Sequence, residues 1–123
     1  EKCNVRYLRP ADIPEPVSLI VVDVAFISVT LLLPALAPLL ATAGGDMIVL
    51  VKPQFEAGKG QVGKGGIVRT EAVRQAAVAR VHAAVEAAGG AVRGVIPSPI
   101  LGAEGNQEFL LAARWAESRG LRT

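Results

Sequence analysis

A strand, helix, strand pattern in the first half of the chain most constrains the fold. Residues 17–22 (VSLIVV) are a run of mostly branched apolar residues, which is typical of a strand buried on both faces. A second run of this kind covers residues 47–51. Between them, Ser28 or Thr30 offers a helix N-cap, and the glycine pair 44–45 offers a stop. The pattern predicts two parallel strands joined by a crossover helix.

The second half of the chain adds a helix and two more strands. Thr70 with Glu71 predicts a helix start, and the glycine pair 89–90 predicts its end. Apolar residues recur between them at helical spacing: Val73, Ala77, Val81, Ala84, Val85 and Ala88. Residues 91–96 and 108–115 are typical of strands. Because their connection is too short for a crossover helix, this last pair should be antiparallel.

The length of the chain and the order of its expected elements favour one α/β domain over residues 1–123, with a mainly parallel sheet, an antiparallel last strand and helices packed on it. Hydrophobic residues make up 51% of the chain but aromatic residues only 4%, so aliphatic side chains must form the core. A net charge of +2 and a pI near 9.1 are compatible with a polyanionic partner without indicating one.

The sequence argues against a membrane span, a disulfide and a metal site. The apolar stretch 29–43 is shorter than the roughly 20 residues that a spanning helix needs. It also contains Pro34 and Pro38, so we expect a buried, kinked helix. Cys3 is the only cysteine and His82 the only histidine, which excludes an internal disulfide and disfavours zinc. With no signal peptide at its start, the chain is expected in the cytoplasm.

Three charged residues stand at the ends of the expected strands. Asp23 and Lys52 follow the first two strands, and Glu108 begins the last one. The carboxyl ends of parallel strands line one crevice, where ligands bind in sheets of this type. An antiparallel last strand would start at that same edge, so the three side chains could converge. The alternative is that each residue simply marks a strand end facing water.

A glycine-rich loop, residues 58–66, matches two phosphate-binding patterns in part. Neither match is good, because residues 53–56 separate the loop from its strand and a glycine follows Lys64 where a P-loop needs serine or threonine. A basic loop that places Lys59, Lys64 and Arg69 against a phosphate backbone is the better interpretation. A merely solvated loop is the alternative.

Five further segments stand out along the chain: residues 4–8 (NVRYL), 23–28 (DVAFIS), 51–56 (VKPQFE), 98–100 (SPI) and 105–110 (GNQEFL). Together they resemble successive signatures of the TlyA/hemolysin A family of FtsJ-like methyltransferases. The ordered strings KPQFEAG and KGGIVR are specific to that family, and together the segments span nearly the whole chain.

The resemblance implies a Rossmann-like methyltransferase fold and 2′-O-methylation of ribosomal RNA, with S-adenosylmethionine as the methyl donor and the ribosome or its RNA as partner. FtsJ-like enzymes use a Lys-Asp-Lys-Glu set, and the resemblance assigns its last three members to Asp23, Lys52 and Glu108. It implies that Lys52 acts on the ribose hydroxyl while both carboxylates orient it. Asp23 and Asn4 are further implied at the donor site.

Other family features have no counterpart in the sequence. These are the first lysine of the set, the glycine-rich turn and acidic residue that hold the donor, and an amino-terminal RNA-binding domain. Ala25 stands where the family usually has serine. We therefore expect the carboxyl-terminal portion of a catalytic domain, with little activity of its own.

Two alternatives to an enzyme stay open. The chain could be a non-catalytic fragment that binds RNA or forms a homodimer through a sheet edge left open by missing strands. It could also be a membrane-active protein, as the hemolysin name suggests, although the interrupted apolar helix argues against this.

Overall fold

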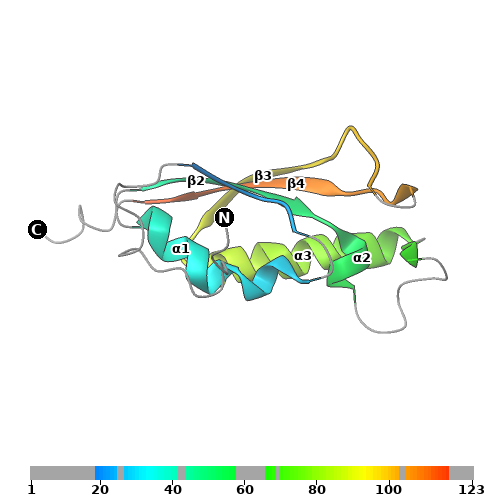
Figure 1. The fold of residues 1–123 in the computed structure, drawn as a ribbon, viewed down its shortest axis with the longest axis horizontal. Coiled ribbons are helices and arrows are strands. Elements are labelled where there is room, and N and C mark those ends of the chain that lie inside the picture. Colours follow the sequence, from blue (N-terminus) through cyan, green and yellow to red (C-terminus); the bar gives the residue numbers. More distant parts are fainter. Residues whose placement is uncertain are drawn as a thin grey trace, which may run out of the picture.

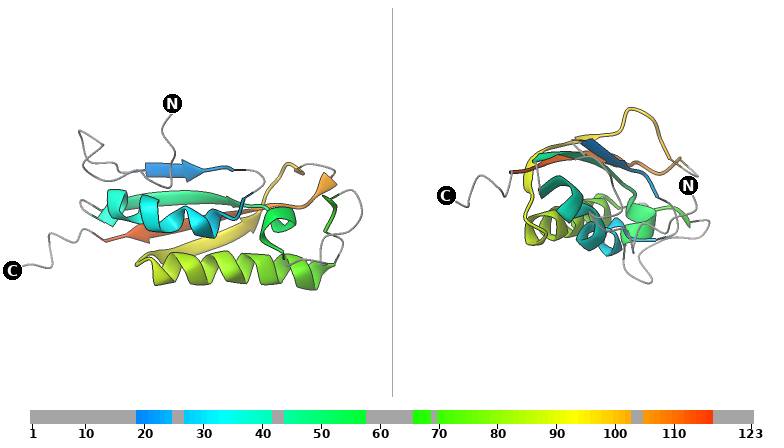
Figure 2. Two further views of the ribbon diagram at one scale, coloured as in Figure 1. Left: turned by 60° about the horizontal axis from the view of Figure 1, so that its bottom comes forward. Right: turned by 60° about the vertical axis from the view of Figure 1, so that its left-hand side comes forward.

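A four-stranded sheet with helices on one face makes up the part of the chain that the structure describes (Figures 1 and 2). This computed structural model describes residues 19–24, 27–41, 44–57, 66–68, 70–102 and 105–116. The elements follow in this order: β1 (Leu19–Val22), the 3-10 helix η3 (Val29–Leu31), α1 (Leu33–Ala41), β2 (Gly45–Val51), α2 (Pro53–Glu56), α3 (Glu71–Ala87), β3 (Ala91–Pro97) and β4 (Phe109–Trp115).

The strands lie in the order β1-β2-β4-β3. β1 and β2 are parallel, and β4 runs antiparallel to both β2 and β3. This confirms the expected parallel pair and the expected antiparallel last pair. The register pairs Val22 with Val49 and Val51 with Phe109. The carboxyl ends of β1 and β2 and the start of β4 therefore lie at one rim of the sheet.

The hydrophobic core lies between the sheet and the helices α1 and α3. Along β2, alternate residues are buried, which is the period of a strand with one covered face. The sheet contributes Met47, Val49, Val51, Leu111 and Ala113, and the helices contribute Leu33, Leu36, Leu40, Val81 and Val85. As expected from the composition, this core is mainly aliphatic.

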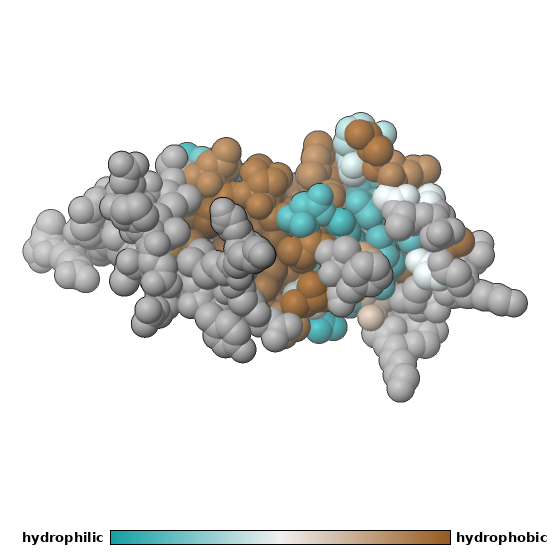
Figure 3. Space-filling model, viewed as in Figure 1, coloured by the Kyte–Doolittle hydropathy of each residue, from teal (hydrophilic) through white to brown (hydrophobic). Residues whose placement is uncertain are grey.

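The opposite face of the sheet is largely open, and the expectation that the first two strands are buried on both faces was wrong. On β1, Leu19 is 56% exposed and Val21 66%, and Figure 3 shows apolar atoms along the sheet. A hollow of about 300 Å³ on this face is lined by Ile48, Arg93, Gly94, Ile96, Leu110 and Ala112.

Chain geometry explains why the described helices share one face. β3 runs parallel to β2, because both are antiparallel to β4. The connections from β1 to β2 and from β2 to β3 therefore step across the sheet in the same direction. Since such crossovers are right-handed, both place their helices on the same side.

The apolar segment after β1 forms two short helices in place of the single kinked helix that the sequence predicted. Ser28 caps η3 by accepting a hydrogen bond from the backbone N–H of Thr30. α1 follows with Pro38 inside it, and its buried side chains include Leu39 and Leu40. Gly44, with a φ of 81°, donates to the carbonyl of Leu40 just after α1 ends. Within the described ranges, no helix has the length and apolar character needed to cross a membrane.

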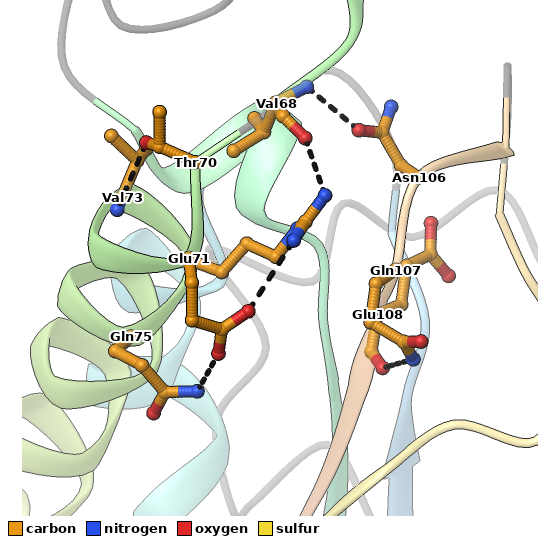
Figure 4. A network of polar contacts seen from close by, with 9 residues as sticks. Val68, Thr70, Glu71, Val73, Gln75, Asn106, Gln107 and Glu108 are labelled. Atoms are coloured by element: carbon orange, nitrogen blue, oxygen red, sulfur yellow. Dashed lines mark hydrogen bonds and ion pairs between the residues drawn. The ribbon is translucent and has the colours of Figure 1, made fainter.

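The expected caps of α3 are confirmed. Thr70 Oγ1 accepts a hydrogen bond from the backbone N–H of Val73, and Glu71 accepts hydrogen bonds from Arg74 and Gln75 (Figure 4). The hydrogen bond from Gln75, followed by that from Arg74, lowers the pKa of Glu71.

The carboxyl end of α3 packs against Trp115. Gly89 has a φ of 96°, and Gly90 donates to the carbonyl of Val85, which is the Schellman pattern. The indole of Trp115 is 2% exposed and donates to the carbonyl of Ala88 at 3.0 Å. The ring lies so close to Gly90 that a Cβ there would be 2.7 Å from two ring carbons.

We expect Gly90→Ala to lower the free energy of unfolding by about 1–3 kcal/mol, because the added methyl group overpacks the Trp115 ring. Urea denaturation of the purified chain measures this change. Gly94→Ala is the matched control, since no atom lies within 4 Å of a Cβ built there. Equal effects of the two substitutions would contradict the packing argument.

Candidate active site at the rim of the sheet

Asp23 and Lys52 meet at the rim. Asp23 follows β1 and Lys52 follows β2, so the parallel pairing of these strands brings the two segments together. Lys52 Nζ lies 2.6 Å from Asp23 Oδ1. The Lys52 side chain is 17% exposed and that of Asp23 59%, so solvent reaches the pair mainly on the aspartate side.

Glu108 precedes β4, the strand next to β2, and lies opposite Lys52 at the rim. Because Val51 pairs with Phe109, the next residues outward on the two strands are Lys52 and Glu108. Glu108 is only 6% exposed. Among the described residues, its carboxylate accepts a hydrogen bond from Gln54 Nε2 at 2.9 Å. Glu108 is thus held by a neutral donor while Lys52 pairs with Asp23.

The loop before β4 encloses the Glu108 carboxylate. Gly102 lies directly against it, and a Cβ at this position would overlap the carboxyl group. The backbone N–H of Gly102 donates to the carbonyl of Asn106 at 2.7 Å, and that of Gly105 donates to the carbonyl of Gly102 at 3.1 Å. The close approach therefore requires glycine at position 102.

Asn106 links this loop to the segment that precedes α3 (Figure 4). Its side chain is 1% exposed. Its Oδ1 accepts from the backbone N–H of Val68 at 2.9 Å, and its Nδ2 donates to the carbonyl of Gly66 at 2.8 Å. Val68 in turn accepts a hydrogen bond from Arg74 of α3. Asn106, which lies two positions before Glu108 in the sequence, thereby holds the end of the glycine-rich loop.

Several residues singled out from the sequence lie outside the described residues. They are Asn4, Ala25, Lys59, Lys64 and Arg69, and their assignments stay predictions.

The helix α2 was missed from the sequence. Residues 53–56 were expected only to separate a strand from the glycine-rich loop, yet they form a helical turn directly after Lys52. Four residues are too few to show helical periodicity. The available signal was Pro53, since proline is favoured at the first helical position.

The two polar side chains of α2 reach other segments of the rim. Gln54 contacts Glu108. Glu56 is 3% exposed and uses both carboxylate oxygens, accepting from Ser28 Oγ at 2.5 Å and from the backbone N–H of Val29 at 2.8 Å. Sequence reasoning assigned no role to either residue, because their partners lie far away in the chain.

The described residues contain no group of three or more metal-ligating side chains. His82 lies on α3, with Nδ1 3.6 Å from the Glu86 carboxylate.

Comparison with known proteins shows which family this chain resembles. The sequence model of the FtsJ-like methyltransferases matches residues 1–115. The 16S/23S rRNA (cytidine-2′-O)-methyltransferase TlyA of Mycobacterium tuberculosis is 42% identical over 121 residues, which are 98% of this chain and 45% of that protein. YqxC of Bacillus subtilis, named as a candidate rRNA methyltransferase, is 45% identical over 116 residues, or 94% of this chain and 41% of YqxC.

Solved structures agree with the sequence comparison. A candidate hemolysin from Streptococcus thermophilus superposes with a TM-score of 0.87 at 43% identity, covering 95% of this chain and 42% of that one. One from Lactococcus lactis gives a TM-score of 0.88 at 38% identity, covering 94% and 55%. The chain thus spans about half the length of its relatives or less. With its mixed sheet, its helices and a family match over nearly its whole length, the chain belongs to the FtsJ-like methyltransferase family.

Proposed function

We propose that this chain is the carboxyl-terminal portion of the catalytic domain of an enzyme that methylates the ribose 2′-hydroxyl of ribosomal RNA. The observation that carries the proposal is the contact between Lys52 and Asp23 at the rim, with Glu108 next across the sheet. These residues stand where the resemblance puts the last three members of the Lys-Asp-Lys-Glu set. The name of the TlyA relative supplies the substrate.

In this proposal Lys52 acts on the ribose oxygen. The hydroxyl must lose its proton as the oxygen takes the methyl group, so a group at the rim has to accept that proton or stabilise the negative charge. A lysine accepts a proton only when it is neutral, whereas a carboxylate beside it favours the charged form. We therefore assign Asp23 and Glu108 to orienting Lys52, which either takes the proton or stabilises the oxyanion.

The methyl donor would be held mostly outside this chain. S-adenosylmethionine, which the family uses, supplies an electrophilic methyl group when bound. The glycine-rich turn and the acidic residue that hold the donor in the family have no counterpart in the sequence, and the hollow on the open sheet face is lined mainly by apolar side chains away from the rim. Asp23, 59% exposed, and Asn4 are proposed as the residues that this chain contributes.

The open sheet face supports the view that this is part of a larger domain. Exposed apolar side chains on β1 and β3 leave a surface that a further layer of helices would cover, since domains bury both faces of a parallel sheet. The longer relatives supply the additional length for such a layer.

The proposed RNA contact is the glycine-rich loop with Lys59, Lys64 and Arg69. Its support is the placement of the flanking residues. The loop begins after α2 and ends at Gly66–Val68, which Asn106 holds beside the rim. Lysine and arginine side chains there would meet the phosphates next to the reacting ribose.

A second candidate function is a homodimerising or RNA-binding fragment without turnover. The exposed β1 favours it, because a sheet edge with exposed apolar residues pairs readily with another chain.

The cytoplasmic setting stays a prediction, and so does the absence of membrane activity.

Lys52→Ala should lower kcat for methyl transfer to ribosomal RNA by about 100-fold or more, since it removes the group proposed to act on the oxygen. The measurement is transfer of a radiolabelled methyl group by the full-length enzyme at saturating RNA. Arg114→Ala is the matched control, because Arg114 forms a similar ion pair with Asp46 at the opposite end of the sheet. Near-normal turnover by Lys52→Ala would remove Lys52 from the mechanism.

Gly102→Ala should lower kcat by about tenfold or more, because the new methyl group displaces the Glu108 carboxylate from its place beside the rim. The same assay measures this, and Gly94→Ala is the control with open space at its Cβ. If a structure of the variant showed Glu108 displaced while turnover stayed normal, Glu108 would have no part in the reaction.

The isolated 123-residue chain should not bind S-adenosylmethionine with micromolar affinity, because the glycine-rich turn and the acidic residue that hold the donor in the family have no counterpart in its sequence. Isothermal titration calorimetry measures this directly. Saturable micromolar binding would contradict the proposal that most of the donor site lies in the part of the catalytic domain outside this chain.

A further inference from the structure

The short helix α2 connects the three segments that carry the candidate active-site residues. It begins directly after Lys52. Gln54 reaches Glu108 in front of β4, and Glu56 reaches Ser28 and Val29 in the segment after β1. One helical turn therefore contacts the loops of both neighbouring strands.

Glu56 makes the tighter of these connections. The residue is 3% exposed, and burying a carboxylate is costly unless it is well hydrogen-bonded. Both oxygens are used: one accepts from the Ser28 hydroxyl and the other from the Val29 N–H at the start of η3. Hydrogen bonds to a charged acceptor are stronger than neutral ones.

A helix cap alone would not require Glu56. Ser28 already caps η3 through its own hydroxyl, which accepts from the N–H of Thr30 at 3.1 Å. Glu56 adds a bond between segments that are 28 residues apart in sequence. Its distinctive effect is therefore to hold two loops at a set separation.

These loops carry Asp23 and Lys52. Ser28 lies five residues after Asp23, and Glu56 lies four residues after Lys52. The Asp23 carboxylate is 59% exposed, and solvent weakens an ion pair that it reaches. The pairing of β1 with β2 brings Asp23 and Lys52 together, and the buried Glu56 contacts add a constraint between the segments that follow these two residues.

We propose that Glu56, held by Ser28 and Val29, is a positioning residue that sets the geometry of the Asp23–Lys52 pair. The inference rests on the proposed function for its catalytic consequence, but its structural part stands on the contacts alone. Loss of the Glu56 contacts lets the Asp23 segment shift relative to Lys52, and a shift of about 1 Å in a catalytic group can lower a rate about 100-fold.

The first experiment measures turnover. In the full-length enzyme, Glu56→Ala should lower kcat about 10- to 100-fold while KM for RNA and for the donor stays within about twofold, because Glu56 is only 3% exposed and is assigned no contact with either substrate. Glu56→Gln retains the shape and one acceptor oxygen, so it should recover part of the lost kcat. Ser28→Ala, which keeps the Val29 contact, should give an intermediate loss.

Trp115→Phe is the matched control for stability. It removes a buried side-chain hydrogen bond at the opposite end of the sheet, where Trp115 pairs with Gly45. It should destabilise the fold without changing kcat per folded molecule. If this control lowered kcat as much as Glu56→Ala does, the effect of Glu56 would be explained by stability alone and not by positioning.

The second experiment needs no activity and uses the 123-residue chain. In side-chain NMR spectra, Glu56→Ala should move the Nζ resonance of Lys52, although Glu56 does not contact that ammonium, and should speed hydrogen exchange at the Val29 amide. Trp115→Phe should leave the Lys52 resonance in place. If Glu56→Ala does not unfold the chain and the Lys52 resonance stays fixed, the positioning role is wrong.

The two experiments separate the inference from the proposed function. If the wild-type full-length enzyme transfers no methyl group to ribosomal RNA, the proposed function fails whatever Glu56 does, and if Lys52→Ala keeps full turnover, Lys52 has no part in the reaction. If Lys52→Ala is inactive and Glu56→Ala keeps wild-type kcat, only the positioning role fails. If Glu56→Ala does not fold, Ser28→Ala and Glu56→Gln decide: unchanged kcat and an unmoved Lys52 resonance in both would overturn the inference.

Discussion

The antiparallel pairing of β4 with β2 is the interaction on which the rest of the structure depends. It inserts the last strand between β2 and β3, and its register brings Phe109 opposite Val51. The start of β4 therefore lies at the carboxyl ends of the two parallel strands. Without this insertion, Glu108 would lie far from Lys52, and the rim would carry only the Asp23–Lys52 pair.

Buried polar side chains concentrate at that rim. Among the described residues, the buried polar or charged side chains are Glu56, Asn106 and Glu108, and each bonds to a different chain segment. Burial of such groups is costly unless they are hydrogen-bonded. Their gathering next to Lys52, while the opposite end of the sheet is held by Trp115 and aliphatic packing, indicates that this end needs defined geometry as well as stability.

The one-sided sheet gives the molecule two unlike faces. One face is packed by α1 and α3 around aliphatic side chains, and the other exposes apolar residues of β1 and β3. In Figure 3 the apolar atoms along the sheet give way to hydrophilic atoms toward the end where Figure 1 shows α2. The proposed chemistry and the proposed docking of the remaining domain thus use different, adjoining parts of the surface.

The sequence by itself determined the order and type of the main elements, because strand and helix patterns, the Thr70 cap and the Gly89 stop depend on neighbouring residues. It also pointed to Asp23, Lys52 and Glu108, since charges that end apolar strands are visible locally. Only the tertiary structure decided that β1 and β2 have one open face, that residues 53–56 form a helix, and that Glu56 holds Ser28. Those features arise from crossover direction and from hydrogen bonds between distant segments, which no local pattern records.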